Sequence, residues 1–255
     1  MLNIQNLTAG YPGNRVLTDV SLAFAQGAVT VVAGPNGCGK STLLKALAGI
    51  LPAEGSLFLD ELDLLTLEKR ELAKKIAFLP QNRPVPEITV KNLVLHGRFP
   101  YLSYPRRYRQ EDHRIAAAAM KKMDVADLAD RDIATLSGGQ RQKVYIAMAL
   151  AQDTPVVLLD EPNTFLDIAH QLQLMDQAKA LAAEGKTVVL VLHDLSMALE
   201  YADSLAVLLD GRCLFQGSPE DAFRSGCLDA AFGVPVQRMK TPEGWKYYFS
   251  GKKIR

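Results

Sequence analysis

Short apolar runs alternate with helical patterns along most of the chain, and this predicts a sheet with helices packed against it. Residues 2–11 and 16–24 alternate between apolar and polar positions with the period of two typical of half-buried strands. The apolar run 28–34 leads directly into a glycine-rich loop and a helical pattern over 40–50. Further strands are expected at 55–60, 155–160, 187–192, 204–210 and 212–217, helices at 167–184 and 194–202, and a helix followed by a strand within 68–80. Buried parallel strands joined by helices are typical of an α/β sheet covered on both faces.

The strand pattern stops between about residues 82 and 152, where the sequence reads as helical. The segment 111–130 carries a run of alanines and is expected to be a packed helix rather than low complexity. Strand and helix alternation returns after residue 155, so the intervening residues form a helical insertion in the sheet. The last segment, 234–249, is expected to be a β-hairpin that turns at 241–244.

The composition is that of an ordinary globular protein, with 48% apolar residues, 22% charged residues and a net charge of +1. A general nucleic-acid binder would show a basic excess, so the charge balance argues against that class. The first 14 residues lack the charged and apolar regions of a signal peptide, and the longest apolar runs are too short to span a bilayer. Three widely spaced cysteines form no zinc pattern and no disulfide framework, which indicates a reducing compartment, the cytosol. If the protein works at a membrane, we expect another chain to supply the spanning helices.

The strongest motif is the glycine-rich loop GPNGCGKS at residues 34–41. Two glycines separated by four residues and followed by lysine and serine form the phosphate-loop pattern, with the strand before it and the helix after it that the pattern requires. The loop N–H groups would surround phosphate oxygens, Lys40 would reach the β- and γ-phosphates, and Ser41 would bind Mg²⁺. A plain glycine turn is the alternative, and the flanking context disfavours it. The dinucleotide-binding pattern fails, because its third glycine would fall at Thr42.

An acidic pair, Asp160 and Glu161, ends the apolar run 156–159. Ligands bind at the carboxyl ends of the strands in such sheets. Asp160 is therefore expected to hold Mg²⁺ through water, and Glu161 to polarise the attacking water. If the pair stood alone, two exposed turn carboxylates before Pro162 would be an equally good interpretation. The phosphate loop favours the catalytic one.

Three single residues are weaker candidates. Gln81 closes an expected strand where the helical insertion begins, so its amide could bind Mg²⁺ or water and respond to movement of the insertion. His193 follows an expected parallel strand and could reach the γ-phosphate, although a lone histidine is more often structural. Tyr11 follows the first strand and is a candidate to stack on adenine, the alternative being a half-buried surface aromatic side chain.

A second phosphate-binding feature, LSGGQ, lies at residues 136–140, where a serine and two glycines open an expected long helix. A helix N-terminus with bare N–H groups attracts anions, but this one lacks a lysine and lies in the helical insertion. It fits a lid that closes over nucleotide held by another copy of the chain. In a two-fold dimer each copy would supply one phosphate loop and one lid.

These motifs resemble the nucleotide-binding subunit of ABC transporters over essentially the full length of the chain. The five elements occur in the family's order, which is Tyr11, the phosphate loop, Gln81, LSGGQ and then VVLLDEP with His193. The resemblance implies a phosphate-loop NTPase core with a mostly parallel sheet, an N-terminal antiparallel β subdomain and an inserted helical subdomain. It implies a single ABC ATPase domain, 1–255, with an α/β nucleotide-binding core at 1–81 and 153–232, a helical subdomain at 82–152 and a hairpin tail at 233–255.

The resemblance also implies the chemistry of the site. ATP and Mg²⁺ bind between two copies, the signature residues of one copy face the γ-phosphate held by the other, and Asp167 communicates across the interface. The catalytic residues would be Lys40, Gln81, Glu161 and His193, with Ser41, Gln81 and Asp160 at Mg²⁺. The ATP-binding residues would be Tyr11, Gly34, Pro35, Asn36, Gly37, Cys38, Gly39, Lys40, Ser41 and Thr42, and the signature residues Ser137, Gly138, Gly139 and Gln140.

A narrower resemblance concerns the cargo. Segments 96–101, 127–143, 146–171 and 217–223 are similar to ATP-binding subunits of importers for ferric siderophores and related metal chelates, with cobalamin and haem importers as near relatives. This implies two membrane permease subunits, a substrate-binding protein as an indirect partner, and a peripheral location at the cytoplasmic face of the cell membrane. Asn163 departs from the pattern, since the relatives usually have threonine beside the expected base. We expect activity to survive this change.

Other classes compete with this interpretation. Arginines and aromatic residues alternate over 97–110, which in isolation would suggest single-stranded nucleic acid. A solvated loop beside a groove that grips a permease helix fits better, and no nucleic acid is expected. A soluble ABC ATPase of DNA repair would need a long coiled-coil insertion before LSGGQ, which is missing here. A translation factor of this family would usually carry a second cassette in the same chain. The sequence does not exclude an iron–sulfur assembly factor. Glu161 and His193 argue against a nucleotide sensor without turnover.

Overall fold

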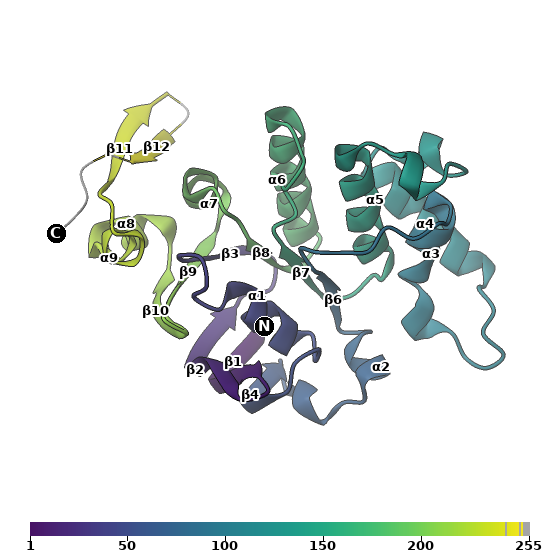
Figure 1. The fold of residues 1–255 in the computed structure, drawn as a ribbon, viewed down its shortest axis with the longest axis horizontal. Helices are drawn as coiled ribbons and strands as arrows, with labels where there is room; N and C mark the ends of the chain where they lie inside the picture. Colours follow the sequence, from purple (N-terminus) through teal and green to yellow (C-terminus); the bar gives the residue numbers. More distant parts are fainter. Residues whose placement is uncertain (243, 250, 252–255) are drawn as a thin grey trace.

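A six-stranded sheet runs through the centre of the molecule (Figure 1). The structure is a computed structural model that describes residues 1–242, 244–249 and 251. The strand order is β10-β9-β3-β8-β7-β6, and every neighbouring pair is parallel except β10 with β9. The strands are β3 (Val29–Ala33), β6 (Ile76–Leu79), β7 (Val156–Asp160), β8 (Thr187–Val191), β9 (Ser204–Leu209) and β10 (Arg212–Gly217). The mostly parallel core sheet predicted from the sequence is therefore confirmed.

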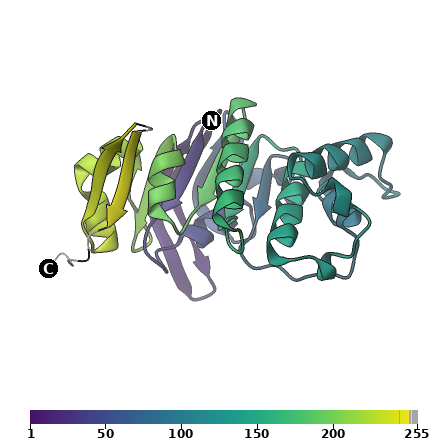
Figure 2. The same cartoon turned by 90° about the horizontal axis from the view of Figure 1, so that it is seen from above.

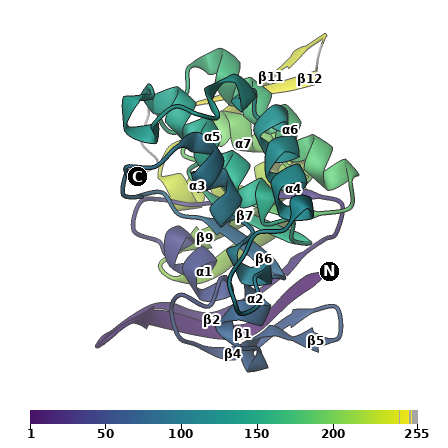
Figure 3. The ribbon, with the colours of Figure 1, turned by 90° about the vertical axis from the view of Figure 1, so that its right-hand side faces the viewer.

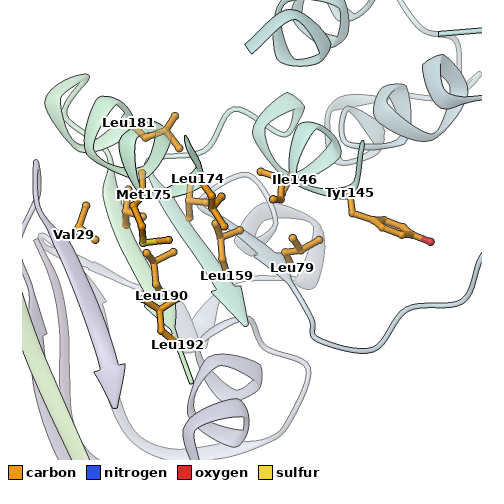
Figure 4. Packing of buried hydrophobic residues seen from close by; sticks show 14 of the residues in the cluster. Val29, Leu79, Tyr145, Ile146, Leu159, Leu174, Met175, Leu181, Leu190 and Leu192 are labelled. Carbon is orange, nitrogen blue, oxygen red and sulfur yellow. The ribbon is translucent and has the colours of Figure 1, made fainter. Parts of the chain in front are cut away.

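Helices cover both faces of this sheet, because side chains of the central strands alternate between two hydrophobic cores. One face carries α6 (Ile168–Ala183) and α7 (Leu195–Tyr201), and the other carries α1 (Lys40–Leu47). Figure 4 shows Met175 of α6 over Leu190 of β8, and Leu174 over Leu159 of β7. Along β7, Leu159 faces this core while Leu158 faces the other one. Apolar residues at every position of a strand thus follow from burial on both sides.

A second, antiparallel sheet with strand order β2-β1-β4-β5 is built mainly from the N-terminal part of the chain. Its strands are β1 (Leu2–Tyr11), β2 (Asn14–Phe24), β4 (Ala53–Leu59) and β5 (Leu62–Asp63). Figure 3 shows this sheet at the bottom of the molecule with α1 above it. Apolar residues of the sheet and of α1 share one buried cluster. This confirms the antiparallel N-terminal subdomain that the family resemblance implied.

The helical insertion packs α3, α4 and α5 together at one end of the molecule (Figure 1). Its helices, and the short ones that precede it, are η1 (Leu64–Thr66), α2 (Lys69–Leu72), α3 (Val90–His96), η2 (Phe99–Tyr101), α4 (Gln110–Lys122), η3 (Ala126–Leu128), η4 (Ile133–Thr135) and α5 (Gly138–Ala151). A buried ion pair joins the end of α3 to α4, with Arg98 Nε 3.0 Å from Asp112 Oδ1. The helix expected over 111–130 is shorter than predicted. Its main part ends at Lys122, because Asp124 adopts a left-handed conformation with φ of 51°.

The C-terminal part folds back beside β9 and β10 and ends in a two-stranded hairpin at the opposite end from the helical insertion (Figure 2). It contains α8 (Pro219–Ser225), α9 (Cys227–Phe232), β11 (Val236–Thr241) and β12 (Gly244–Phe249). The strands pair in the antiparallel sense, as predicted. Residue 243 of the expected turn and residues 250 and 252–255 of the expected tail lie outside the described residues. Within the part of the chain that the structure describes, none of the helices has the length and apolar character needed to cross a bilayer.

Candidate active site

Four neighbouring parallel strands deliver the candidate residues to one edge of the central sheet. The phosphate loop follows β3, His193 follows β8, Asp160 ends β7 and Gln81 follows β6. Because these strands are parallel, their carboxyl ends meet at the same edge. They border a cleft of about 380 Å³, which is lined by Val16, Asn36, Gly37, Gly39, Lys40, Ser41, Thr42, Gln81, Glu161 and His193.

The phosphate loop has a conformation that only glycine tolerates at its ends. Gly34 has a φ of 148°, and a Cβ atom there would lie 2.2 Å from the carbonyl oxygen of Leu208. Gly39 has a φ of 107° and serves as the N-cap of α1. The side chain of Lys40 folds back over the loop, and its Nζ donates to the carbonyl oxygens of Gly34 and Pro35 at 2.7 and 2.9 Å. The ammonium group is thus already held at the mouth of the loop, at the N-terminus of a helix, where anions bind.

Ser41 and Asp160 meet behind the loop. The hydroxyl of Ser41 lies 3.1 Å from Oδ1 of Asp160, whose residue is 1% exposed. Burial raises the pKa of the Asp160 carboxyl, and the neighbouring Glu161 carboxylate adds to this effect, while the hydrogen bond from Ser41 opposes it. The ionised carboxylate therefore lacks compensation in the protein alone, which suits a group that works next to a cation.

The raised pKa of Asp160 predicts the effect of removing its charge. A carboxyl whose pKa is raised by folding is more easily protonated in the folded state, so the folded protein loses stability as pH rises through that pKa. We expect Asp160→Asn to raise the Tm of the nucleotide-free protein at pH 8 by about 2–4 °C, the effect of roughly 1 kcal/mol in a domain of this size. The gain shrinks toward pH 4. The exposed control Asp176→Asn should show no such trend, and a gain in Tm that is equal at every pH would contradict this explanation.

Glu161 is buried in the cleft and has an unusual backbone conformation. Its residue is 6% exposed and has a φ of 51°, a left-handed conformation that costs free energy for a residue other than glycine. One carboxylate oxygen, Oε2, accepts a hydrogen bond from Nε2 of Gln81 and lies 2.7 Å from Nε2 of His193. Three residues that the sequence offered as separate candidates are therefore in direct contact, and the carboxylate is the centre of the group.

The LSGGQ segment lies elsewhere. Ser137 is the N-cap of α5, and it forms a capping box with Gln140, since each accepts a hydrogen bond from the backbone N–H of the other. The two glycines line a separate hollow of about 710 Å³, together with Asp167 and His170. None of the phosphate-loop residues borders that hollow. Within one chain the structure does not bring together the two features that the sequence predicts to bind phosphate.

Asp167 caps the N-terminus of α6 beside this hollow. Its carboxylate accepts a hydrogen bond from the backbone N–H of His170 at 2.9 Å and lies 2.8 Å from Nδ1 of the same residue. These bonds, first that from the backbone N–H, hold the pKa of the Asp167 carboxyl below its usual range. Phe165, two residues earlier, is 80% exposed and borders the same hollow.

Tyr11 does not line the cleft of the phosphate loop. It lies in a neighbouring hollow between β1 and β4, is 43% exposed, and its hydroxyl accepts a hydrogen bond from Nζ of Lys45 at 3.1 Å. Asn163 is buried next to the acidic pair, and its carbonyl oxygen accepts from the N–H of Leu166. Sequence reasoning missed a cluster within the helical insertion, in which Arg83 contacts both Gln142 and Tyr145 of α5. The only signal in the sequence was their nearness to Gln81 and to LSGGQ.

Comparison with known proteins identifies the family. The protein-family model for the ABC transporter domain matches residues 17–164, which is more than half of the chain. The chain belongs to the ABC transporter family. The ferric enterobactin transport ATP-binding protein FepC of Escherichia coli strain K12 is 40% identical over 241 residues, covering 93% of this chain and 89% of the relative. The hemin import ATP-binding protein HmuV of Nocardia farcinica is 42% identical over 233 residues, covering 91% of this chain and 80% of the relative.

Solved ABC transporters share the whole fold. A metal-chelate type ABC transporter in an inward-facing conformation superimposes with a TM-score of 0.83 at 28% identity, covering 98% of this chain and 96% of that chain. The chain is accordingly an ATP-binding ABC cassette, and the activity of its family is ATP hydrolysis coupled to transport. The predicted α/β cassette fold is confirmed.

Proposed function

We propose that this ABC cassette hydrolyses ATP to power a multi-subunit importer of a ferric siderophore or a related metal chelate. The proposal of ATP hydrolysis rests on one observation: the lysine of the phosphate loop, Lys40, and a buried carboxylate, Glu161, line the same cleft. The cargo is inferred from the names of the relatives, one of which transports ferric enterobactin. The proposal thus has two parts: ATP hydrolysis, which is based on the cleft, and transport of an iron chelate, which is based on the relatives.

Nucleotide would lie along the phosphate loop, with its phosphates over the N-terminus of α1. The loop residues proposed to bind it are Gly34, Pro35, Asn36, Gly37, Cys38, Gly39, Lys40, Ser41 and Thr42. Lys40 would exchange the two loop carbonyls that it now contacts for phosphate oxygens. Tyr11 would stack on adenine from the adjoining hollow, which requires a change of its present contact with Lys45.

The donor set beside the loop fits Mg²⁺. Ser41 and Asp160 offer hard oxygen ligands 3.1 Å apart, and within the described residues Asp160 has no ion pair with a basic side chain. No group of three or more His, Cys, Asp or Glu side chains suited to a metal occurs among these residues, so a cation here would depend on phosphate oxygens and water, as Mg²⁺ does. Ser41, Gln81 and Asp160 would hold it, and when bound it neutralises phosphate charge.

Glu161 is proposed as the group that polarises the attacking water. Its carboxylate lies in the cleft, accepts from Gln81 and contacts His193, so both neighbours orient it. His193 and Lys40 would stabilise the charge that develops on the γ-phosphoryl group. His193 is half exposed at its side chain, which leaves it free to turn from Glu161 toward phosphate.

The separation of LSGGQ from the phosphate loop supports a dimer of two copies. Ser137, Gly138, Gly139 and Gln140 of one copy would close over the nucleotide of the other, and Asp167 would communicate across the interface. Two permease subunits would bind the helical subdomain, a substrate-binding protein would act indirectly, and the cassette would lie peripherally at the cytoplasmic face of the cell membrane. The division that we propose is a core at 1–81 and 153–232, a helical subdomain at 82–152 and a hairpin tail at 233–255.

Haem import is the second candidate, because the relative HmuV is named for hemin import. Cobalamin import and a soluble role in iron–sulfur assembly are further alternatives, and no nucleic acid is expected. A strain that lacks the gene for this chain tests the cargo. We expect it to lose uptake of radiolabelled ferric siderophore, and to regain it with the intact chain but not with Glu161→Gln. Normal siderophore uptake with a loss of haem or cobalamin uptake would overturn the siderophore assignment.

A further inference from the structure

A buried chain of hydrogen bonds links the segment after Gln81 to the backbone after Glu161. Nη2 of Arg83 donates to Oε1 of Gln142 at 2.7 Å, and Nε2 of Gln142 donates to the carbonyl oxygen of Pro162 at 2.6 Å. Gln142 is 3% exposed. Its amide can face only one way, since a guanidinium only donates and a carbonyl only accepts.

Two further contacts hold the same segment to α5. The hydroxyl of Tyr145 donates to the carbonyl oxygen of Pro84 at 2.6 Å, and the guanidinium of Arg83 lies 4.5 Å from the centre of the Tyr145 ring. Figure 4 shows Tyr145 projecting away from the core residues around it. Gln142 and Tyr145 stand three residues apart on α5, so they present one face of the helix. The segment that follows Gln81 is therefore tied to α5 through both residues.

The same helix begins at the signature glycines. Gly138 and Gly139 open α5, and Gln142 follows one turn later. Pro162, which receives the hydrogen bond from Gln142, directly follows Glu161. Because the φ angle of proline is fixed, fewer backbone rotations are available to absorb a displacement of the Pro162 carbonyl before it reaches Glu161. A shift of α5 thus reaches the carboxylate through one hydrogen bond.

The Arg83 side chain is only partly hydrogen-bonded in the described part of the chain. Nη1 of Arg83 is buried and has no hydrogen-bond partner in the described part of the chain. A hollow of about 300 Å³ beside it is lined by Gln81, Gln142 and Tyr145, among others. A buried donor without an acceptor is costly, so an arrangement that supplies one would be favoured when the helical subdomain moves.

We propose that Gln142, oriented by Arg83, is a positioning residue that sets the geometry of Glu161 according to the position of α5. This inference rests on the proposed ATP hydrolysis between two copies. In that dimer the N-terminus of α5 faces the nucleotide of the partner copy, while Gln142 acts on the carboxylate of its own copy. Gln142 thereby couples the two ATP sites.

The test compares three variants of the full-length chain by steady-state kinetics. Gln142→Met keeps the approximate size of the side chain and loses both bonds. Gln142→Glu keeps an acceptor for Arg83 but loses the donor to Pro162. Arg83→Met loses the bond to Gln142 and the contact with the Tyr145 ring, but it leaves the bond from Gln142 to Pro162 in place. For both Gln142 variants we expect kcat to fall about tenfold, with the KM for ATP within about twofold of wild type. The Hill coefficient for ATP should fall toward 1. Arg83→Met should show a smaller loss, and the Arg83→Met/Gln142→Met double variant should be no worse than Gln142→Met.

The controls separate this idea from the proposed function. Arg114→Met removes an exposed arginine of the helical insertion that pairs with Glu111, and it should keep wild-type kinetics. If the wild-type chain hydrolyses ATP and Glu161→Gln does not, while Gln142→Glu keeps the wild-type kcat, the positioning role is wrong and the proposed function stands. A parallel loss of ATP binding and kcat in the Gln142 variants would show a merely structural role and would also overturn it. If Gln142→Met fails to fold, Gln142→Glu and Arg83→Met decide the question.

Discussion

Replacing Glu161 by glutamine is expected to lower the rate of ATP hydrolysis by about 100- to 10,000-fold, the range for loss of a general base. Glutamine has nearly the same size and can still accept the hydrogen bond from Gln81 through its oxygen. It cannot accept a proton from water. The loss of a negative charge beside the γ-phosphate also removes a repulsion, so ATP binding and ATP-dependent association of two copies should be retained.

The rate of phosphate release measures the loss of hydrolysis. Analytical ultracentrifugation with and without ATP measures the association of two copies. A matched control is Glu184→Gln, which removes an exposed carboxylate that pairs with Lys122 at the far end of α6. This variant should hydrolyse ATP like wild type. Hydrolysis at the wild-type rate by Glu161→Gln would show that another group, or water alone, serves as the base.

Gly138→Asp is expected to lower hydrolysis by a similar factor for a different reason. The change places a carboxylate at the N-terminus of α5, where the proposed dimer brings the γ-phosphate of the partner copy, and the like charges repel. A Cβ atom at this position would lie 3.4 Å from Cβ of Phe165, so the folded chain has little to rearrange. Because the glycine lies outside the cleft of Lys40, a single copy should bind ATP within about threefold of wild type while dimer formation is lost.

Mixing two inactive variants tests whether the signature acts between copies. Lys40→Ala damages the phosphate loop and Gly138→Asp damages the lid, and each should be nearly inactive alone. In a mixed dimer the intact loop of one copy meets the intact lid of the other, so random pairing in a two-fold arrangement should restore activity, up to about a quarter of wild type if the two sites act independently and less if they are coupled. No recovery in the mixture, together with a loss of ATP binding in Gly138→Asp, would place the lid and the loop in the same chain.

The fold could be predicted well because strands that are buried on both faces appear in the sequence as short runs of apolar residues. The runs 156–160 and 187–191 are apolar or nearly so, and every residue in them is buried. The order of the motifs placed Lys40, Asp160 and Gln81 at one sheet edge, since parallel strands share the direction of their carboxyl ends. The helix over 111–130 was predicted too long, because a left-handed residue such as Asp124 carries no strong sequence signal.

The contacts within the site could not be predicted. Nothing in the spacing of Gln81, Glu161 and His193 indicates that two of them share one carboxylate oxygen of the third. The bond from Gln142 to Pro162 joins positions 20 residues apart, because α5 lies beside the turn that follows β7. Such contacts depend on the relative placement of elements, which a hydrophobic pattern does not specify.

The position of the Lys40 ammonium has a consequence for nucleotide capture. The hydrogen bonds from Lys40 to the carbonyl oxygens of Gly34 and Pro35 hold the loop in shape before nucleotide binds. The loss of conformational entropy when ATP binds should therefore be small. Nucleotide binding would then replace the two hydrogen bonds of the Lys40 ammonium with bonds to phosphate, without rebuilding the loop. In the proposed dimer, the slow part of the cycle would then be the association and separation of the two copies.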